Sequence, residues 1–216
     1  GIAIDDDDRL VLADRGRREI AVLDLWSRRL LRRIPVASSA APTRAPIGLA
    51  ARGRDVVAVV ADPPGLLSLT ARRGPTELAR PSAADLPPAA TPRRVAITAS
   101  GTTVMLWATP DGAAWLIADG RAPLPVGGAC ELVASGETVV LGPSAADEHG
   151  QAPLHRVLLT ATGWIRAQPL DARGYDGRGV VARGGGRIGY WSASGFRLAV
   201  AGRVRDGTCR GGGDRA

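Results

Sequence analysis

Short apolar runs separated by polar turns make up the first 36 residues of the chain. Aliphatic residues gather at 1–4, 10–13, 20–25 and 30–36, and segments rich in aspartate or arginine separate them. The apolar positions do not recur at the three- and four-residue spacing of a helix. Four short strands joined by three turns form an antiparallel meander, which is the plan of one blade of a β-propeller.

The same pattern recurs along the rest of the chain. First-strand residues of the successive units lie 37 to 48 residues apart, at Ile2, Ile47, Val95, Leu132 and Val180. This spacing brackets the usual length of a propeller repeat. We therefore predict an all-β fold, a β-propeller of about five blades with four antiparallel strands each.

The blade boundaries follow from the turns and from two connections rich in alanine and proline. The predicted propeller covers 1–204, with blades at approximately 1–36, 46–78, 92–126, 129–170 and 177–204. Five repeats are enough to close a ring, and the alternative is five blades of a six-bladed ring. The Gly- and Arg-rich tail, 205–216, is expected to be flexible.

The basic residues restrict the possible chemistry. All 28 are arginine, and the chain has no lysine and no asparagine. Schiff-base chemistry, a phosphate-loop lysine and N-glycosylation are therefore excluded. A net charge of +7 suggests nucleic acid, but the arginines are spread over nearly every turn and aromatic residues are only 4%. We expect solvated blade edges rather than a nucleic-acid interface.

The apolar runs are strand-sized and interrupted by charges, so no membrane-spanning helix is expected. The chain begins with Gly1 inside a strand pattern, which favours a fragment or a processed product. Localisation therefore stays open between the cytoplasm and an extracellular assembly.

A few residues are candidates for metal binding or disulfide formation, and for each of them we favour a structural interpretation. The run 5–8 is four aspartates, which we interpret as a solvated turn rather than a calcium loop. The spacing of His149 and His155 does not match that of a zinc site. We expect His149 to lie in a solvated loop and His155 to be a half-buried packing residue. Cys130 and Cys209 could form a bridge to the tail, but a pairing is not favoured. No catalytic residue, metal site or cofactor is predicted. The tryptophans expected to pack between blades are Trp107, Trp115, Trp164 and Trp191.

One face of the propeller is the best candidate for ligand binding. Turns between second and third strands, the connections between blades and the three longest irregular segments (37–45, 80–93 and 142–153) all belong to it. The alternative is that these segments are insertions without function. The candidate face collects Asp14, Arg17, Asp62, Asp111, Asp147, His149 and Tyr175.

Two resemblances to known families add to this picture. The strands at 1–5, 10–14 and 20–24 resemble an NHL-type propeller repeat, in which a Gly-aliphatic-Ala-aliphatic-Asp strand precedes an aliphatic-Ala-Asp strand. The phrases at 23–33 and 175–181 are similar to the propeller part of actinobacterial phage-tail-like proteins of contractile injection systems. That resemblance implies a structural or target-binding role, and neither resemblance implies a catalytic residue.

The sequence therefore favours a non-enzymatic scaffold that binds a protein or glycan through its loop-rich face, within a phage-tail-like assembly. The alternative is a propeller lyase or hydrolase, acting on a small-molecule substrate at the mouth of the channel. Such enzymes place several histidine or acidic ligands around the axis, whereas this chain has two histidines, both in one repeat. An enzyme is therefore the less favoured reading, and nucleic-acid binding the least.

Overall fold

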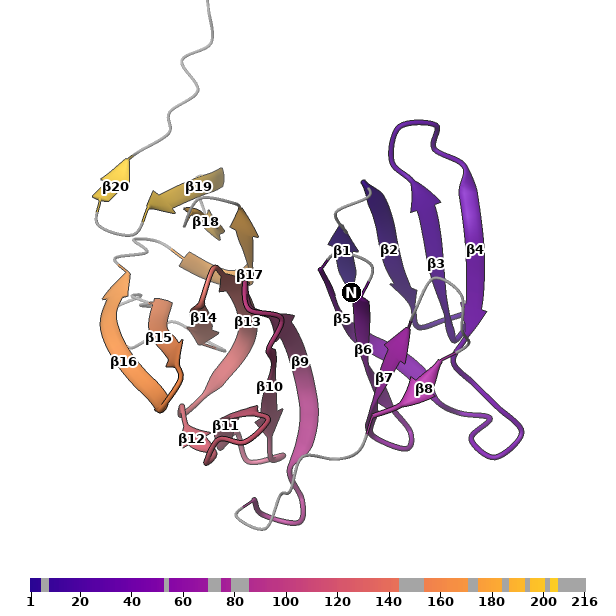
Figure 1. Cartoon of the computed structure of the whole chain (residues 1–216), viewed down its shortest axis with the longest axis horizontal. Coiled ribbons are helices and arrows are strands. Elements are labelled where there is room, and N and C mark those ends of the chain that lie inside the picture. Colours follow the sequence, from indigo (N-terminus) through magenta and orange to yellow (C-terminus); the bar gives the residue numbers. More distant parts are fainter. Residues whose placement is uncertain are drawn as a thin grey trace, which may run out of the picture.

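Figure 1 shows the computed structural model of the chain, which consists of β-strands, turns and connections. The structure describes residues 1–216 except 5–7, 53–54, 70–74, 79–85, 144–153, 171–174, 184–186, 193–194, 201–202 and 206–216. The strands form five sheets of four strands each, which we number sheets 1 to 5 along the chain.

Each sheet is a meander of consecutive strands. Sheet 1 contains β1 (Ile2–Ile4), β2 (Arg9–Asp14), β3 (Glu19–Asp24) and β4 (Leu30–Pro35). Sheet 2 contains β5 (Ala45–Arg52), β6 (Asp55–Ala61), β7 (Gly65–Leu69) and β8 (Thr76–Glu77). Sheet 3 contains β9 (Thr91–Ile97), β10 (Thr103–Ala108), β11 (Ala114–Ala118) and β12 (Leu124–Pro125). Sheet 4 contains β13 (Ala129–Ser135), β14 (Thr138–Pro143), β15 (Leu154–Thr160) and β16 (Gly163–Leu170). Sheet 5 contains β17 (Tyr175–Arg183), β18 (Arg187–Ser192), β19 (Gly195–Val200) and β20 (Arg203–Arg205).

Continuous apolar runs place the second strand of a sheet between two neighbouring sheets. In β6 the five residues from Val56 to Val60 are all buried. Alternate side chains of a strand point to opposite faces, so the run fills two cores at once. Val56, Ala58 and Val60 pack towards sheet 1, while Val57 and Val59 pack towards sheet 3.

A hydrophobic core therefore lies between each pair of successive sheets. Trp107 is buried between sheets 2 and 3, with Trp115 packed against the same core. Trp164 packs against the core between sheets 3 and 4, and its indole N–H donates to the carbonyl oxygen of Ala122 at 3.0 Å. The predicted packing role is confirmed for these three tryptophans. The side chain of Trp191 lies outside the described residues.

The first strands of the sheets pack in chain order, β1 on β5, β5 on β9, β9 on β13 and β13 on β17. This is the arrangement of propeller blades around an axis, which confirms the predicted all-β propeller with its five four-stranded sheets. Within the described residues, no helix is long and apolar enough to span a membrane.

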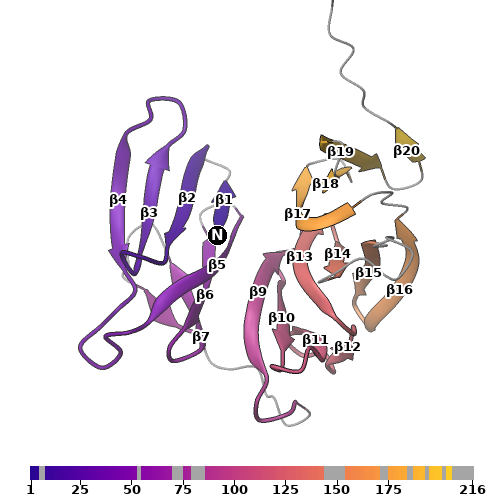
Figure 2. The ribbon, with the colours of Figure 1, turned by 180° about the vertical axis from the view of Figure 1, so that it is seen from behind.

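The five sheets do not complete a ring. In Figures 1 and 2, sheets 1 and 5 lie at the two ends of an arc, with β17 apart from β1. Ile2 and Ile4 of β1 are accordingly 71% and 54% exposed. Five repeats are numerous enough for a closed ring, but here the arc stays open between sheets 1 and 5.

Candidate binding face

The turns between second and third strands and the connections between sheets lie at one end of the meanders, which we call the connection end. At sheets 1 and 2 it is the lower end in Figure 1. The first connection, 36–44, is held against sheet 1 by two hydrogen bonds. The guanidinium Nη1 of Arg18 donates to the carbonyl oxygen of Pro42 at 2.7 Å, and the backbone N–H of Val36 donates to the carbonyl oxygen of Arg18 at 3.0 Å.

The same connection is also tied to sheet 2. The hydroxyl of Thr43 donates to the carbonyl oxygen of Asp62 at 2.9 Å, in the turn between β6 and β7. Arg44, whose side chain is only 13% exposed, pairs with Glu77 of β8 at 3.0 Å. A segment rich in alanine and proline is thus a fixed bridge between two sheets, with Pro42, Thr43 and Asp62 exposed along it.

Asp14 and Arg17 stabilise the adjoining turn of sheet 1. One carboxylate oxygen of Asp14 accepts the backbone N–H of Arg17 at 2.9 Å, and the other lies 3.8 Å from the Arg17 guanidinium. The Asp14 carboxylate is therefore committed to the turn, whereas the Arg17 side chain remains 64% exposed.

Asp111 occupies the equivalent turn of sheet 3, between β10 and β11. A hydrogen bond from the Thr109 hydroxyl, together with backbone N–H groups of the turn, holds the pKa of Asp111 below its ordinary value. The carboxylate is exposed, so it is charged and available to a ligand at neutral pH.

A groove of about 280 Å³ opens at the connection end between sheets 3 and 4. Val126, Leu141 and Val157 form much of its apolar part, and His155 and Arg166 add polar groups to its lining. The guanidinium Nη2 of Arg166 donates to the carbonyl oxygen of Pro125 at 2.5 Å, which joins the two sheets across the groove.

His155 is exposed, so the prediction of a half-buried packing residue is wrong. His155 is on the same face of β15 as the buried Val157 and Leu159, but it lines the groove between sheets 3 and 4 and is open to solvent there. The pairing of β15 with β16 shifts beside it, where Gln168 and Pro169 of β16 lie opposite His155, so the extra residue of this β-bulge belongs to β16.

The remaining candidate residues fall elsewhere. Tyr175 is 2% exposed and packs edge-on against Tyr190, with ring centroids 6.3 Å apart, between sheets 4 and 5. It supports that interface and offers no surface to a ligand. Asp147 and His149 lie outside the described residues, as do Asp5, Asp6 and Asp7.

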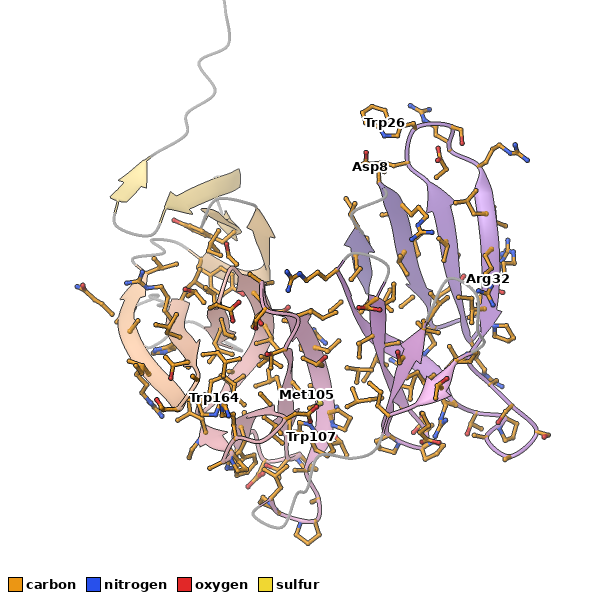
Figure 3. All side chains as sticks on the ribbon, in the orientation of Figure 1. Asp8, Trp26, Arg32, Met105, Trp107 and Trp164 are labelled. Carbon is orange, nitrogen blue, oxygen red and sulfur yellow. The ribbon has the colours of Figure 1, made fainter. Side chains whose placement is uncertain are left out.

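Asp8 and Trp26 lie together at the opposite tip of sheet 1 (Figure 3). The indole N–H of Trp26 donates to a carboxylate oxygen of Asp8 at 3.1 Å, and Trp26 is 79% exposed. In the described part of the chain, no three His, Cys, Asp or Glu side chains are grouped so as to bind a metal. Cys130 is half-buried on β13, where burial raises the pKa of its thiol, and Cys209 lies outside the described residues.

The structure therefore brings Asp14, Arg17, Asp62 and Asp111 to one end of sheets 1 to 3, and adds residues that sequence reasoning missed. Arg18, Thr43 and Arg44 fix the connection, and His155 and Arg166 line the groove. The only sequence signal for the first group is the polar Thr43 and Arg44 inside an Ala/Pro-rich segment.

Comparisons with known proteins identify the fold and no family. No family model and no curated protein matches the chain. It is similar to the β-propeller domain of Cps50 (Swd1) from Myceliophteria thermophila, with a TM-score of 0.60, 10% identity and coverage of 95% of this chain and 70% of that one. A chain of the mitotic checkpoint complex gives a TM-score of 0.60 at 14% identity, over 95% of this chain and 64% of that one.

Virginiamycin B lyase from Staphylococcus aureus is also similar, with a TM-score of 0.51, 9% identity and coverage of 94% of this chain and 69% of that one. At such low identity these likenesses establish a β-propeller fold alone. The chain spans 60% of the length of the matched hydrazine synthase chain of Kuenenia stuttgartiensis and 70% of the Cps50 domain.

Proposed function

We propose that this chain is a non-enzymatic binding scaffold of NHL-type repeats that recognises a protein or a glycan through its connection end. The observation that carries the proposal is the connection 36–44, which is hydrogen-bonded to turns of two sheets. A loop held in place before binding loses little conformational entropy when a ligand arrives. Binding residues are commonly found on such loops over a rigid scaffold.

The chemistry of this end suits a polar ligand. Arg17 and Arg166 supply guanidinium donors, Asp62 and Asp111 supply acceptors, and His155 lines the groove between sheets 3 and 4. Donors and acceptors on neighbouring sheets can pair with the hydroxyl groups of a glycan or with the polar rim of a protein surface.

We place the module in a phage-tail-like assembly on the resemblance of 23–33 and 175–181 to propellers of contractile injection systems. The test is co-purification from the native host. Recovery of sheath or baseplate proteins with the wild-type chain supports the assembly, and recovery of none of them contradicts it.

The binding proposal is tested with paired variants in the same two sheets. Arg17→Gln with Asp111→Asn alters the connection end, and Arg28→Gln with Asp119→Asn alters turns at the opposite end with the same change of charge. A ligand found by glycan array or affinity capture should bind the first variant at least about tenfold more weakly, which is roughly the loss of one or two polar contacts. Equal affinity for both double variants, or a loss confined to the second, would contradict the proposal.

A further inference from the structure

The outer face of sheet 1 is apolar and uncovered towards the tip of the sheet, whereas Glu19 and Arg33 form an ion pair on the same face nearer the connection end. The register of its strands aligns Ile4, Leu10, Leu23 and Leu30 in one row across the sheet and Ile2 with Leu12 in the next. We call these six residues the sheet-1 outer face. The opposite face of the same sheet, with Val11, Ile20 and Ile34, is buried against sheet 2.

Exposed large hydrophobic side chains are concentrated here. Among the described residues seven such side chains are exposed, and only Ile165 lies outside sheet 1 and its turn. Ile2, Ile4 and Leu30 belong to the sheet-1 outer face, and Leu25, Trp26 and Leu31 lie in or beside the turn between β3 and β4. A contiguous exposed apolar patch on a folded domain marks an interaction surface.

The equivalent face is covered in the next sheet. In sheet 2 the residues that correspond to Leu10, Leu12 and Leu23 are Val56, Ala58 and Leu69, and all three are no more than 8% exposed because sheet 1 lies against them. Each of β5, β9 and β13 packs between two neighbouring first strands. Among the described first strands, β1 packs against β5 only. The sheet-1 outer face therefore extends an interface that the fold already repeats.

The opening between sheets 1 and 5 is too small for a second copy of the chain. Propellers have about four to eight blades, so an arc of five sheets leaves room for at most about three more. A second copy would bring five sheets and a further net charge of +7.

We propose that the sheet-1 outer face is the docking surface for a further propeller blade, a four-stranded antiparallel sheet from outside residues 1–216. Its first strand lies beside β1, and its buried face carries aliphatic residues like those of Val11, Ile20 and Ile34 in sheet 1. The surface is separate from the connection end, so the proposal stands or falls independently of the proposed binding function.

The test is photo-crosslinking in the native host, with a benzophenone amino acid replacing Ile4, Leu30 or, as the control, Ile165. Ile165 is 53% exposed on β16, close to the 54% of Ile4. We expect adducts at Ile4 and Leu30 at least about tenfold above the control, because a packed interface holds its partner next to the probe. The captured peptide should belong to a strand with alternating aliphatic residues from outside this sequence.

Capture of residues 1–36 from another molecule would show self-association and overturn the proposal. A captured helix, a lipid adduct or a yield equal to the control would overturn it as well. Ile4→Glu with Leu30→Glu provides the second readout. This variant should lose association with the captured segment at least about tenfold while keeping its Tm, since both side chains are already exposed.

Discussion

At the scale of single residues, Gly142 has the least room for a side chain among the described glycines, at the place where sheet 4 meets sheet 5. A Cβ atom added to Gly142 on β14 would lie 2.7 Å from the hydroxyl oxygen of Tyr175 and 3.2 Å from Cβ of Glu131. Tyr175 is buried and cannot swing into solvent. Gly142 is therefore required by the close approach of a neighbouring side chain.

Gly142→Ala is expected to lower the free energy of unfolding by about 1–3 kcal/mol, the usual cost of overpacking a core. Tyr175→Phe removes the hydroxyl that the new methyl group meets. The double variant should therefore be less destabilised than the sum of the two single variants in urea unfolding. Strict additivity would show that the hydroxyl does not limit the space at Gly142.

The carboxyl of Asp111 is expected to affect stability at low pH. The Thr109 hydrogen bond lowers its pKa in the folded chain, so Asp111 stabilises the fold above its ordinary pKa. This contribution is lost as pH falls through the lowered folded-state pKa. Thr109→Val should raise the pKa of Asp111 towards its ordinary value in an NMR titration. Thr162→Val, in an exposed turn of sheet 4, should leave it unchanged.

At the scale of elements, stability resides in the cores between sheets. Leu116 of β11 is fully buried between sheets 3 and 4, whereas Leu31 of β4 is 51% exposed. Leu116→Ala should cost about 2–5 kcal/mol in the free energy of unfolding. Leu31→Ala should change it by no more than about 0.5 kcal/mol. A large loss from both substitutions would show that sheet 1 is covered in solution.

The strands and their grouping into sheets could be predicted from the sequence because apolar runs and turn residues act locally. The apolar run 56–61 and the turns 62–65 and 110–112 were enough to predict β6, β7, β10 and β11. The exposure of His155 could not be predicted, since it depends on the groove that forms between sheets 3 and 4. The anchoring of the connection 36–44 could not be predicted either, because each bond joins residues that are far apart in the sequence. Arg18 bonds to Pro42, Thr43 to Asp62, and Arg44 to Glu77.

At the scale of the whole molecule, the number of blades could be predicted from the sequence, whereas it could not be predicted whether the ring closes. Each repeat specifies a sheet with two apolar faces, but the angle between neighbouring sheets depends on the shapes of all side chains in the core between them. The position of Arg17, Asp62 and Asp111 at the connection end could be predicted, because topology alone assigns the turns between second and third strands to one end. Tyr175 was misread as a surface residue because its strand, β17, begins at Tyr175 itself.

The central claim, an open arc of five blades whose first sheet is uncovered, is tested most directly by thiol reactivity. Cysteines replace Ile4 and, as the buried reference, Val11, in a background where Cys130 and Cys209 are serine. At micromolar protein concentration, the thiol at position 4 should react with a disulfide reagent at least about a hundredfold faster than the thiol at position 11. Equal and slow reaction at both positions would mean that another sheet covers β1 and that the ring is closed.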